Sequence, residues 1–78
     1  MRIFVGHLAS TTTEDELRQL FLPYELVTLV RIVTSRQTGC SLGYGYVEMP
    51  NATEAQAAMA GLQGTTLEGH TLTVNKAY

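Results

Sequence analysis

The chain is short of charge, of cysteine and of long apolar runs. Only 15% of its 78 residues are charged, and five lysines and arginines against seven aspartates and glutamates give a net charge of −2. A general binder of polyanions is usually basic, so this balance argues against one. No apolar run approaches the roughly 18 residues of a membrane span, and we expect no signal sequence before the first strand. Cys40 is the single cysteine and cannot form an internal disulfide, which fits a cytoplasmic location, or a nuclear one in a eukaryote.

Patterns that would support catalysis or metal binding are missing as well. His7, His70 and Cys40 do not have the spacing of metal ligands. The sequence suggests no Ser–His–Asp or Cys–His arrangement. We therefore expect no enzymatic activity, no metal and no cofactor.

Two segments alternate as β-strands do and carry aromatic rings. In residues 42–49, Tyr44 and Tyr46 point to one face, and Phe4 lies opposite Ile3 and Val5 in a second segment. Rings on an open face are costly unless something stacks on them, and unpaired bases stack on flat rings. The alternative is that all three rings are ordinary core or edge aromatics. Strand parity argues against it, because both faces of a sheet cannot be core in so small a domain.

Two capped helices and two further strands complete the pattern. The capping box Thr13-x-x-Glu16 begins a helix that Pro23 ends, and Asn51-x-x-Glu54 begins a second one. Each helix has one apolar stripe: Leu17, Leu20 and Phe21 in the first, and Ala55, Ala58, Met59 and Leu62 in the second. β-Branched residues predict strands over 27–33 and 71–75. The inward positions on these strands are predicted to be Thr28, Val30, Ile32, Leu72 and Val74, and the outward ones Leu29, Arg31, Val33, Thr71, Thr73 and Asn75.

The predicted order is therefore βαββαβ, a single α+β domain over residues 1–78. Both helices should cover one face of a four-stranded antiparallel sheet in a ferredoxin-like sandwich. The other face of the sheet should stay open.

The two aromatic segments resemble the motifs of the RNA recognition motif family. The family's octamer reads Lys/Arg-Gly-Phe/Tyr-Gly/Ala-Phe-Val-x-Phe/Tyr. Its matches here are Gly43, Tyr44, Gly45 and Val47, with Tyr46 replacing Phe, while Leu42 and Met49 depart from it. The hexamer, aliphatic-aromatic-aliphatic-x-Asn-Leu, is matched by Ile3, Phe4, Val5 and Leu8, with His7 where Asn is common. The chain is similar to small single-domain bacterial members of the family.

The resemblance implies binding of short single-stranded RNA, with single-stranded DNA as a second ligand. In the family, the residues equivalent to Phe4 and Tyr46 stack on bases and the one equivalent to Tyr44 packs against sugars. The region of strand four and the C-terminus reads bases in the family. The candidate RNA-binding residues are Phe4, Tyr44, Tyr46, Arg2, Arg31, Leu42, His7, Thr73, Asn75 and Lys76. Arg2, Arg31 and Lys76 either reach a phosphate or base edge or are solvated. His7 either contacts a base or is an ordinary side chain that is solvated or bonded to the backbone. Tyr78 either adds a fourth ring or frays.

The departure at Leu42 keeps a second function open. The family usually places there a Lys or Arg that pairs with phosphate, so a leucine lowers the electrostatic affinity. Leu42, Leu29 and Val33 also add apolar area to the open face. Exposed apolar area commonly marks protein contacts, so the alternative is a module that binds a protein partner or forms a weak homodimer.

Overall fold

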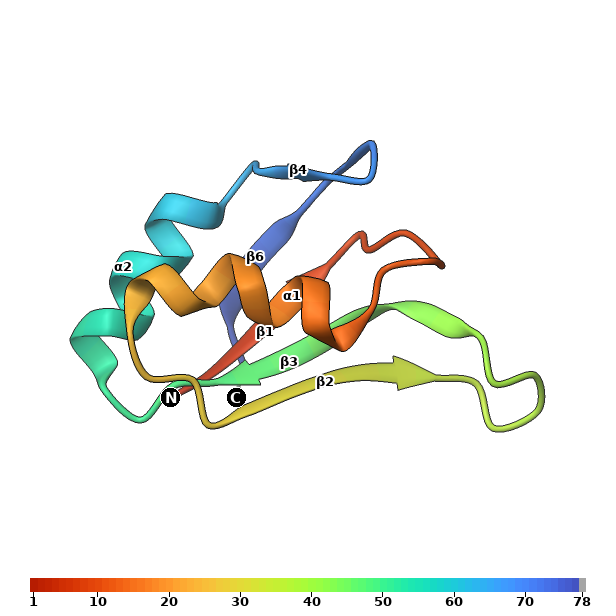
Figure 1. Ribbon diagram of the computed structural model, residues 1–78, viewed down its shortest axis with the longest axis horizontal. Helices are drawn as coiled ribbons and strands as arrows, with labels where there is room; N and C mark the ends of the chain where they lie inside the picture. Colours follow the sequence, from red (N-terminus) through yellow and green to blue (C-terminus); the bar gives the residue numbers. More distant parts are fainter. Residues whose placement is uncertain (78) are drawn as a thin grey trace.

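In a computed structural model that describes residues 1–77, the chain forms a helix layer on one side of a β-sheet (Figure 1). The elements in chain order are β1 (Arg2–Gly6), α1 (Glu14–Phe21), the 3-10 turn η1 (Leu22–Tyr24), β2 (Leu29–Thr34), β3 (Ser41–Glu48), α2 (Ala52–Leu62), β4 (Thr66–Leu67), β5 (His70–Thr71) and β6 (Thr73–Lys76). The main sheet is antiparallel, in the order β2-β3-β1-β6, and β4 and β5 form a separate hairpin. The predicted ferredoxin-like fold is confirmed.

Both helices begin where their capping residues predict. The Thr13 hydroxyl accepts from the Glu16 amide at 3.2 Å, and the Glu16 carboxylate accepts from the Thr13 amide at 3.0 Å. In α2, the Asn51 side chain accepts from the Glu54 amide at 3.0 Å. Pro23 lies in η1, and α1 stops before it because proline lacks the N–H that would continue the ladder.

The core lies between the helices and the sheet. It contains Ile3, Val5, Leu8, Leu17, Phe21, Val27, Val30, Ile32, Val47, Met49, Ala55, Ala58, Leu62, Leu72 and Val74. Ala55 and Ala58 are fully buried, and their small side chains allow α2 to approach the sheet closely. Met49, which departs from the family octamer, is also fully buried. An unbranched methionine fills core space in place of an aromatic ring.

The prediction for the start of the second strand was wrong. Thr28 is exposed, Val27 is buried, and β2 begins at Leu29. The amide and the hydroxyl of Thr28 both donate to the Glu48 carbonyl, at 3.0 and 3.2 Å. Alternation therefore begins only at Leu29, because an irregular segment leads into the strand.

The far end of the β2–β3 pair is irregular. Ile32 pairs with Gly45 but Thr34 pairs with Ser41, so residues 42–44 lie opposite Val33 alone. Gly43 has a φ of 88° there, a conformation that glycine adopts without a steric penalty. The loop after β2 extends beyond the helices at one end of the molecule (Figure 1).

Candidate nucleic-acid interface

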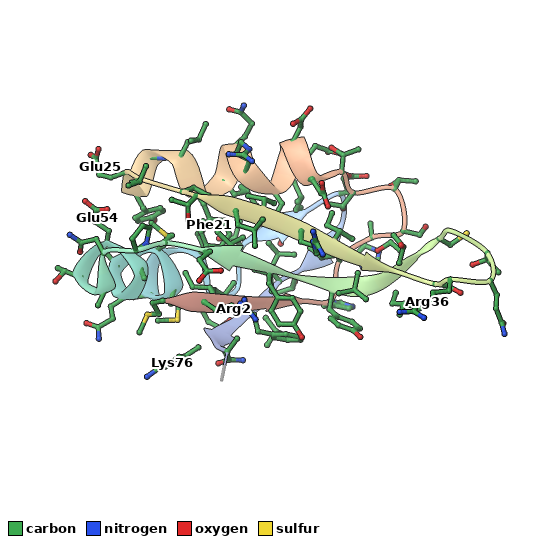
Figure 2. All side chains as sticks on the ribbon, turned by 90° about the horizontal axis from the view of Figure 1, so that it is seen from below. Arg2, Phe21, Glu25, Arg36, Glu54 and Lys76 are labelled. Carbon is green, nitrogen blue, oxygen red and sulfur yellow. The ribbon has the colours of Figure 1, made fainter. Side chains whose placement is uncertain are left out.

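A row of candidate RNA-binding side chains crosses the face of the sheet that the helices leave open. Arg31 pairs with Tyr46, Tyr46 with Phe4, and Phe4 with Asn75, so the row runs through all four strands of the sheet. Direct cross-strand partners share a face. In Figure 2, Phe21 lies between α1 and the sheet, and Arg2 lies on the opposite side of the sheet.

Phe4, Tyr44 and Tyr46 form the aromatic cluster of this face. The ring centroids are 5.8 Å apart for Phe4 and Tyr44, 6.1 Å for Phe4 and Tyr46, and 6.4 Å for the two tyrosines. These are ordinary distances for tilted and edge-to-face contacts. All three rings are partly exposed, so the cluster offers aromatic surface to a ligand.

Gly6 lies beside the cluster, between Tyr44 and Thr73 in the strand register. A Cβ at Gly6 would lie 2.9 Å from Cε2 of Phe4. The Phe4 ring therefore occupies the space that a side chain at this position would need.

Charged groups flank the cluster at the end of β3. Arg2 pairs with Glu48 across β1 and β3, and their side chains form an ion pair with an N–O distance of 3.5 Å. The guanidinium carbon of Arg2 also lies 5.8 Å from the Tyr46 ring centroid, a cation–π distance. Leu29 pairs with Glu48 from the other side. Sequence reasoning missed Glu48 as a member of this face, although its spacing of two residues from Tyr46 is the signal that places it there.

An open hollow of about 350 Å³ lies next to this ion pair. It is lined by Arg2, Leu29, Arg31 and Tyr46. We call it the Tyr46 hollow. It brings a ring, an apolar side chain and two guanidinium groups to one place.

The other predicted site residues lie at the margins. Leu42 is 53% exposed in the irregular part of β3. Thr73 and Asn75 are exposed on β6. Lys76 pairs with the core residue Ile3, so the strand register places it on the helix side of β6 and not in the row with Phe4. Tyr78 lies outside the described residues.

His7 contacts the β4–β5 hairpin. Its Nδ1 lies 2.7 Å from the Thr71 carbonyl oxygen, and its ring centroid lies 4.9 Å from that of His70. The position has a φ of 63°, which is uncommon for residues other than glycine. The structure thus gives His7 the backbone contact that was one of its two interpretations.

The hairpin is also tied to the loop before α1. The hydroxyls of Thr11 and Thr12 donate to the Glu68 carboxylate at 2.5 and 3.2 Å. Hydrogen bonding from Thr11 lowers the pKa of Glu68 most, hydrogen bonding with Glu16 comes next, and Thr12 and His70 act in the same direction.

The described residues show neither a membrane helix nor a metal site. No helix within residues 1–77 is long and apolar enough to cross a membrane. No three His, Cys, Asp or Glu side chains in that range group as metal ligands.

Comparison with known proteins identifies the family. The family profile of the RNA recognition motif matches residues 3–73. RbpE of Nostoc sp. is 42% identical over 77 residues, which are 99% of this chain and 78% of RbpE. The chloroplastic RNA-binding protein CP31B of Arabidopsis thaliana is 41% identical over 76 residues, 97% of this chain and 26% of CP31B. The chain belongs to the RNA recognition motif family, and it spans about a quarter of the length of CP31B.

Solved structures agree with this family. The crystal structure of RNA binding protein PG1 has a TM-score of 0.95 at 38% identity, covering 99% of this chain and 93% of that one. The second RRM domain of the yeast poly(U)-binding protein Pub1 has a TM-score of 0.92 at 34% identity, with coverages of 99% and 93%.

Proposed function

We propose that this chain binds a short single-stranded RNA on its open sheet face, without a chemical step. Bases stack on Phe4 and Tyr46, and Tyr44 packs against sugars. The observation that carries the proposal is the aromatic cluster, whose three rings lie within 6.4 Å of one another on the face opposite the helices. Membership of the RNA recognition motif family supports RNA as the ligand. Single-stranded DNA is the second ligand of this proposal, because stacking does not require the 2′-hydroxyl.

Polar side chains on the same face would fix the position of the strand. Arg31, next to Tyr46, can reach a phosphate or a base edge. Asn75, next to Phe4, can both donate to and accept from a base. Thr73 extends this line toward Tyr44. We place the protein in the cytoplasm, because a free, exposed cysteine such as Cys40 suits a reducing compartment.

The protein-binding alternative is less well supported by the geometry. Leu29 and Leu42 are 38% and 53% exposed, but Leu29 pairs with Glu48 at one end of β3 and Leu42 lies near the other end. Six residues of strand separate these ends by roughly 20 Å. Val33, which is half-buried, lies opposite residues 42–44 and so near Leu42. Leu29 therefore does not join Val33 and Leu42 in one apolar patch of the kind that marks a protein interface.

Alanine substitutions in the cluster test the proposal. Phe4→Ala or Tyr46→Ala should each cost about 1–3 kcal/mol of RNA affinity, the usual value of one stacked base. Fluorescence anisotropy with a pool of random RNA octamers measures the affinity, and circular dichroism checks the fold. Leu22→Ala is the control, since Leu22 is 44% exposed in η1, away from this face. Wild-type affinity in both folded cluster variants would refute base stacking.

A further inference from the structure

The acidic side chain of Glu48 lies on the same face as the aromatic cluster, Arg2 and Arg31. Glu48 continues the alternation of Tyr44 and Tyr46 on β3, and its cross-strand partners are Leu29 and Arg2. A negative charge beside an RNA site lowers the affinity for RNA of any sequence. Electrostatic attraction of RNA therefore does not explain why Glu48 lies on this face.

The ion pair of Glu48 leaves its carboxylate open to a ligand. Its Oε2 lies 3.5 Å from Nη2 of Arg2, which is longer than the 2.7–2.9 Å of a charge-assisted hydrogen bond. The Glu48 side chain is 37% exposed and that of Arg2 is 53% exposed. A bound molecule can therefore reach the carboxylate without breaking a buried salt bridge.

The Tyr46 hollow is lined by Arg2, Leu29, Arg31 and Tyr46, and Glu48 lies beside it through its ion pair with Arg2. The Tyr46 hollow, of about 350 Å³, is near the lower end of the range for small-molecule sites. A base stacked on Tyr46 has Arg31 directly across the strand pair. It has Glu48 two residues along β3, a rise of about 6.8 Å. Donors and acceptors of the protein thus meet two different edges of the base.

Guanine is the base whose edges match this arrangement. A carboxylate only accepts hydrogen bonds and a guanidinium only donates them. Guanine presents two adjacent donors, N1–H and the N2 amino group, which match the two oxygens of Glu48. It also presents the acceptors O6 and N7, the usual partners of arginine. Adenine and cytosine place a ring acceptor beside a single amino group, and uracil flanks its N3–H with two carbonyls, so each would leave Glu48 facing an acceptor.

We propose that the Tyr46 hollow is a guanine-selective subsite, in which Glu48 accepts from the N1 and N2 edge and Arg31 donates to O6 or N7. This inference rests on the proposed RNA binding. It makes Glu48 a determinant of base preference in addition to the stacking rings.

The test measures base preference instead of affinity alone. Uridine octamers that carry a single guanine, adenine, cytosine or hypoxanthine base at each position in turn are titrated by anisotropy. In wild type, guanine at one position should bind at least about fivefold more tightly than adenine, as a bidentate contact to a base predicts. Hypoxanthine, which lacks the N2 amino group, should fall between them. Glu48→Gln should abolish the preference for guanine and leave binding of the all-uridine octamer equal or stronger, because a negative charge is lost.

Two further variants separate base contact from an indirect role. If Glu48 only positions Arg2 over Tyr46, Arg2→Met should abolish the preference as Glu48→Gln does, and the proposal is overturned. If Glu48 touches the base, Arg2→Met weakens all octamers alike and keeps the preference. Glu25→Gln is the matched charge control, because Glu25 lies on the helix side in Figure 2.

Failure of the subsite and failure of RNA binding give different results. Wild-type protein that binds the octamers in a Phe4-dependent manner but does not prefer guanine overturns the subsite alone. Wild-type protein that binds none of the octamers overturns the proposed function.

Discussion

The Phe4 ring fills the space beside Gly6. The backbone of Gly6 does not need the left-handed conformation, but a Cβ there would meet the ring at 2.9 Å. Gly6→Ala should therefore displace the ring from the cluster while the strand still forms. We expect RNA affinity to fall by about 1 kcal/mol, the lower end of the value of one stacked base, measured by anisotropy at constant salt. An alanine variant that keeps full affinity would show that the ring's present position is not the one RNA uses.

Gly45, which lies in β3 between Val5 of β1 and Ile32 of β2, has a different constraint. A Cβ there would overlap the carbonyl oxygen of Arg31 and lie 3.0 Å from Cα of Ile32. Backbone atoms cannot rotate away as a side chain can, so Gly45→Ala must shift β2 against β3. We expect a loss of stability of about 1–3 kcal/mol, typical of overpacking, measured by urea unfolding. The Gly6→Ala variant is the control, because the added Cβ there meets a movable ring and not the backbone. Equal stability of the two variants would contradict the different constraints on Gly6 and Gly45.

The β4–β5 hairpin depends on a contact with a distant part of the chain. Glu68 stands in its turn with a φ of 51°, followed by Gly69 at 79°, as tight hairpin turns require. Its carboxylate accepts from Thr11 and Thr12 in the loop before α1. Ionised Glu68 therefore connects two segments that are separate in the sequence.

This contact should make stability depend on pH in a defined direction. Because the pKa of Glu68 is lowered in the folded protein from an ordinary value of 4.5, its contribution is complete above that value and is lost as the pH falls through the lowered pKa. Glu68→Gln should thus reduce stability at pH 7 and lessen the loss between pH 5 and pH 2, measured by urea unfolding at each pH. Glu25→Gln serves as the control. Parallel pH profiles for wild type and Glu68→Gln would exclude the contribution.

The parts of the fold that the sequence predicted are those set by neighbours along the chain. Thr13, Glu16 and Asn51 cap helices through contacts three residues away. Alternation placed Phe4 and Tyr46 on one face because the period of two holds throughout β1 and the second half of β3. These signals need no knowledge of distant contacts.

The missed parts depend on contacts between distant segments. Thr28 took the outward position because its amide and hydroxyl bond to the Glu48 carbonyl on the neighbouring strand. The β4–β5 hairpin has two residues in each strand, too few for an alternation pattern, and Glu68 anchors it to threonines 56 and 57 residues earlier. Lys76 was placed on the open face from its sequence position, whereas its pairing with Ile3 shows the opposite parity.

The distribution of charge over the molecule should make RNA binding only weakly dependent on salt. The net charge is −2, and Arg2 is paired with Glu48. Each phosphate neutralised on a single strand contributes about −0.7 to the slope of log affinity against log salt. With Arg2 and Arg31 as the cations that line the Tyr46 hollow, we expect a slope no steeper than about −2. A slope near −5 would mean that basic residues elsewhere contact the RNA.

Leu42→Lys tests whether the leucine, which stands where the family octamer has Lys or Arg, makes RNA affinity only weakly dependent on salt. Leu42 is exposed in β3, two residues before Tyr44, where a lysine can reach a phosphate of RNA stacked on the cluster. The variant should bind RNA more tightly at low salt and steepen the slope by nearly 0.7, one phosphate's worth. Leu22→Lys adds the same charge on η1, away from the open face, so an equal gain there would indicate a general charge effect. Sedimentation of the Leu42→Lys variant tests the alternative function, in which Leu42 contacts a protein partner or a second copy of the chain. If Leu42 belongs to a protein contact, the lysine breaks a dimer and leaves RNA affinity unchanged; if it stands at a phosphate site, the protein keeps its wild-type sedimentation and only the RNA titration changes.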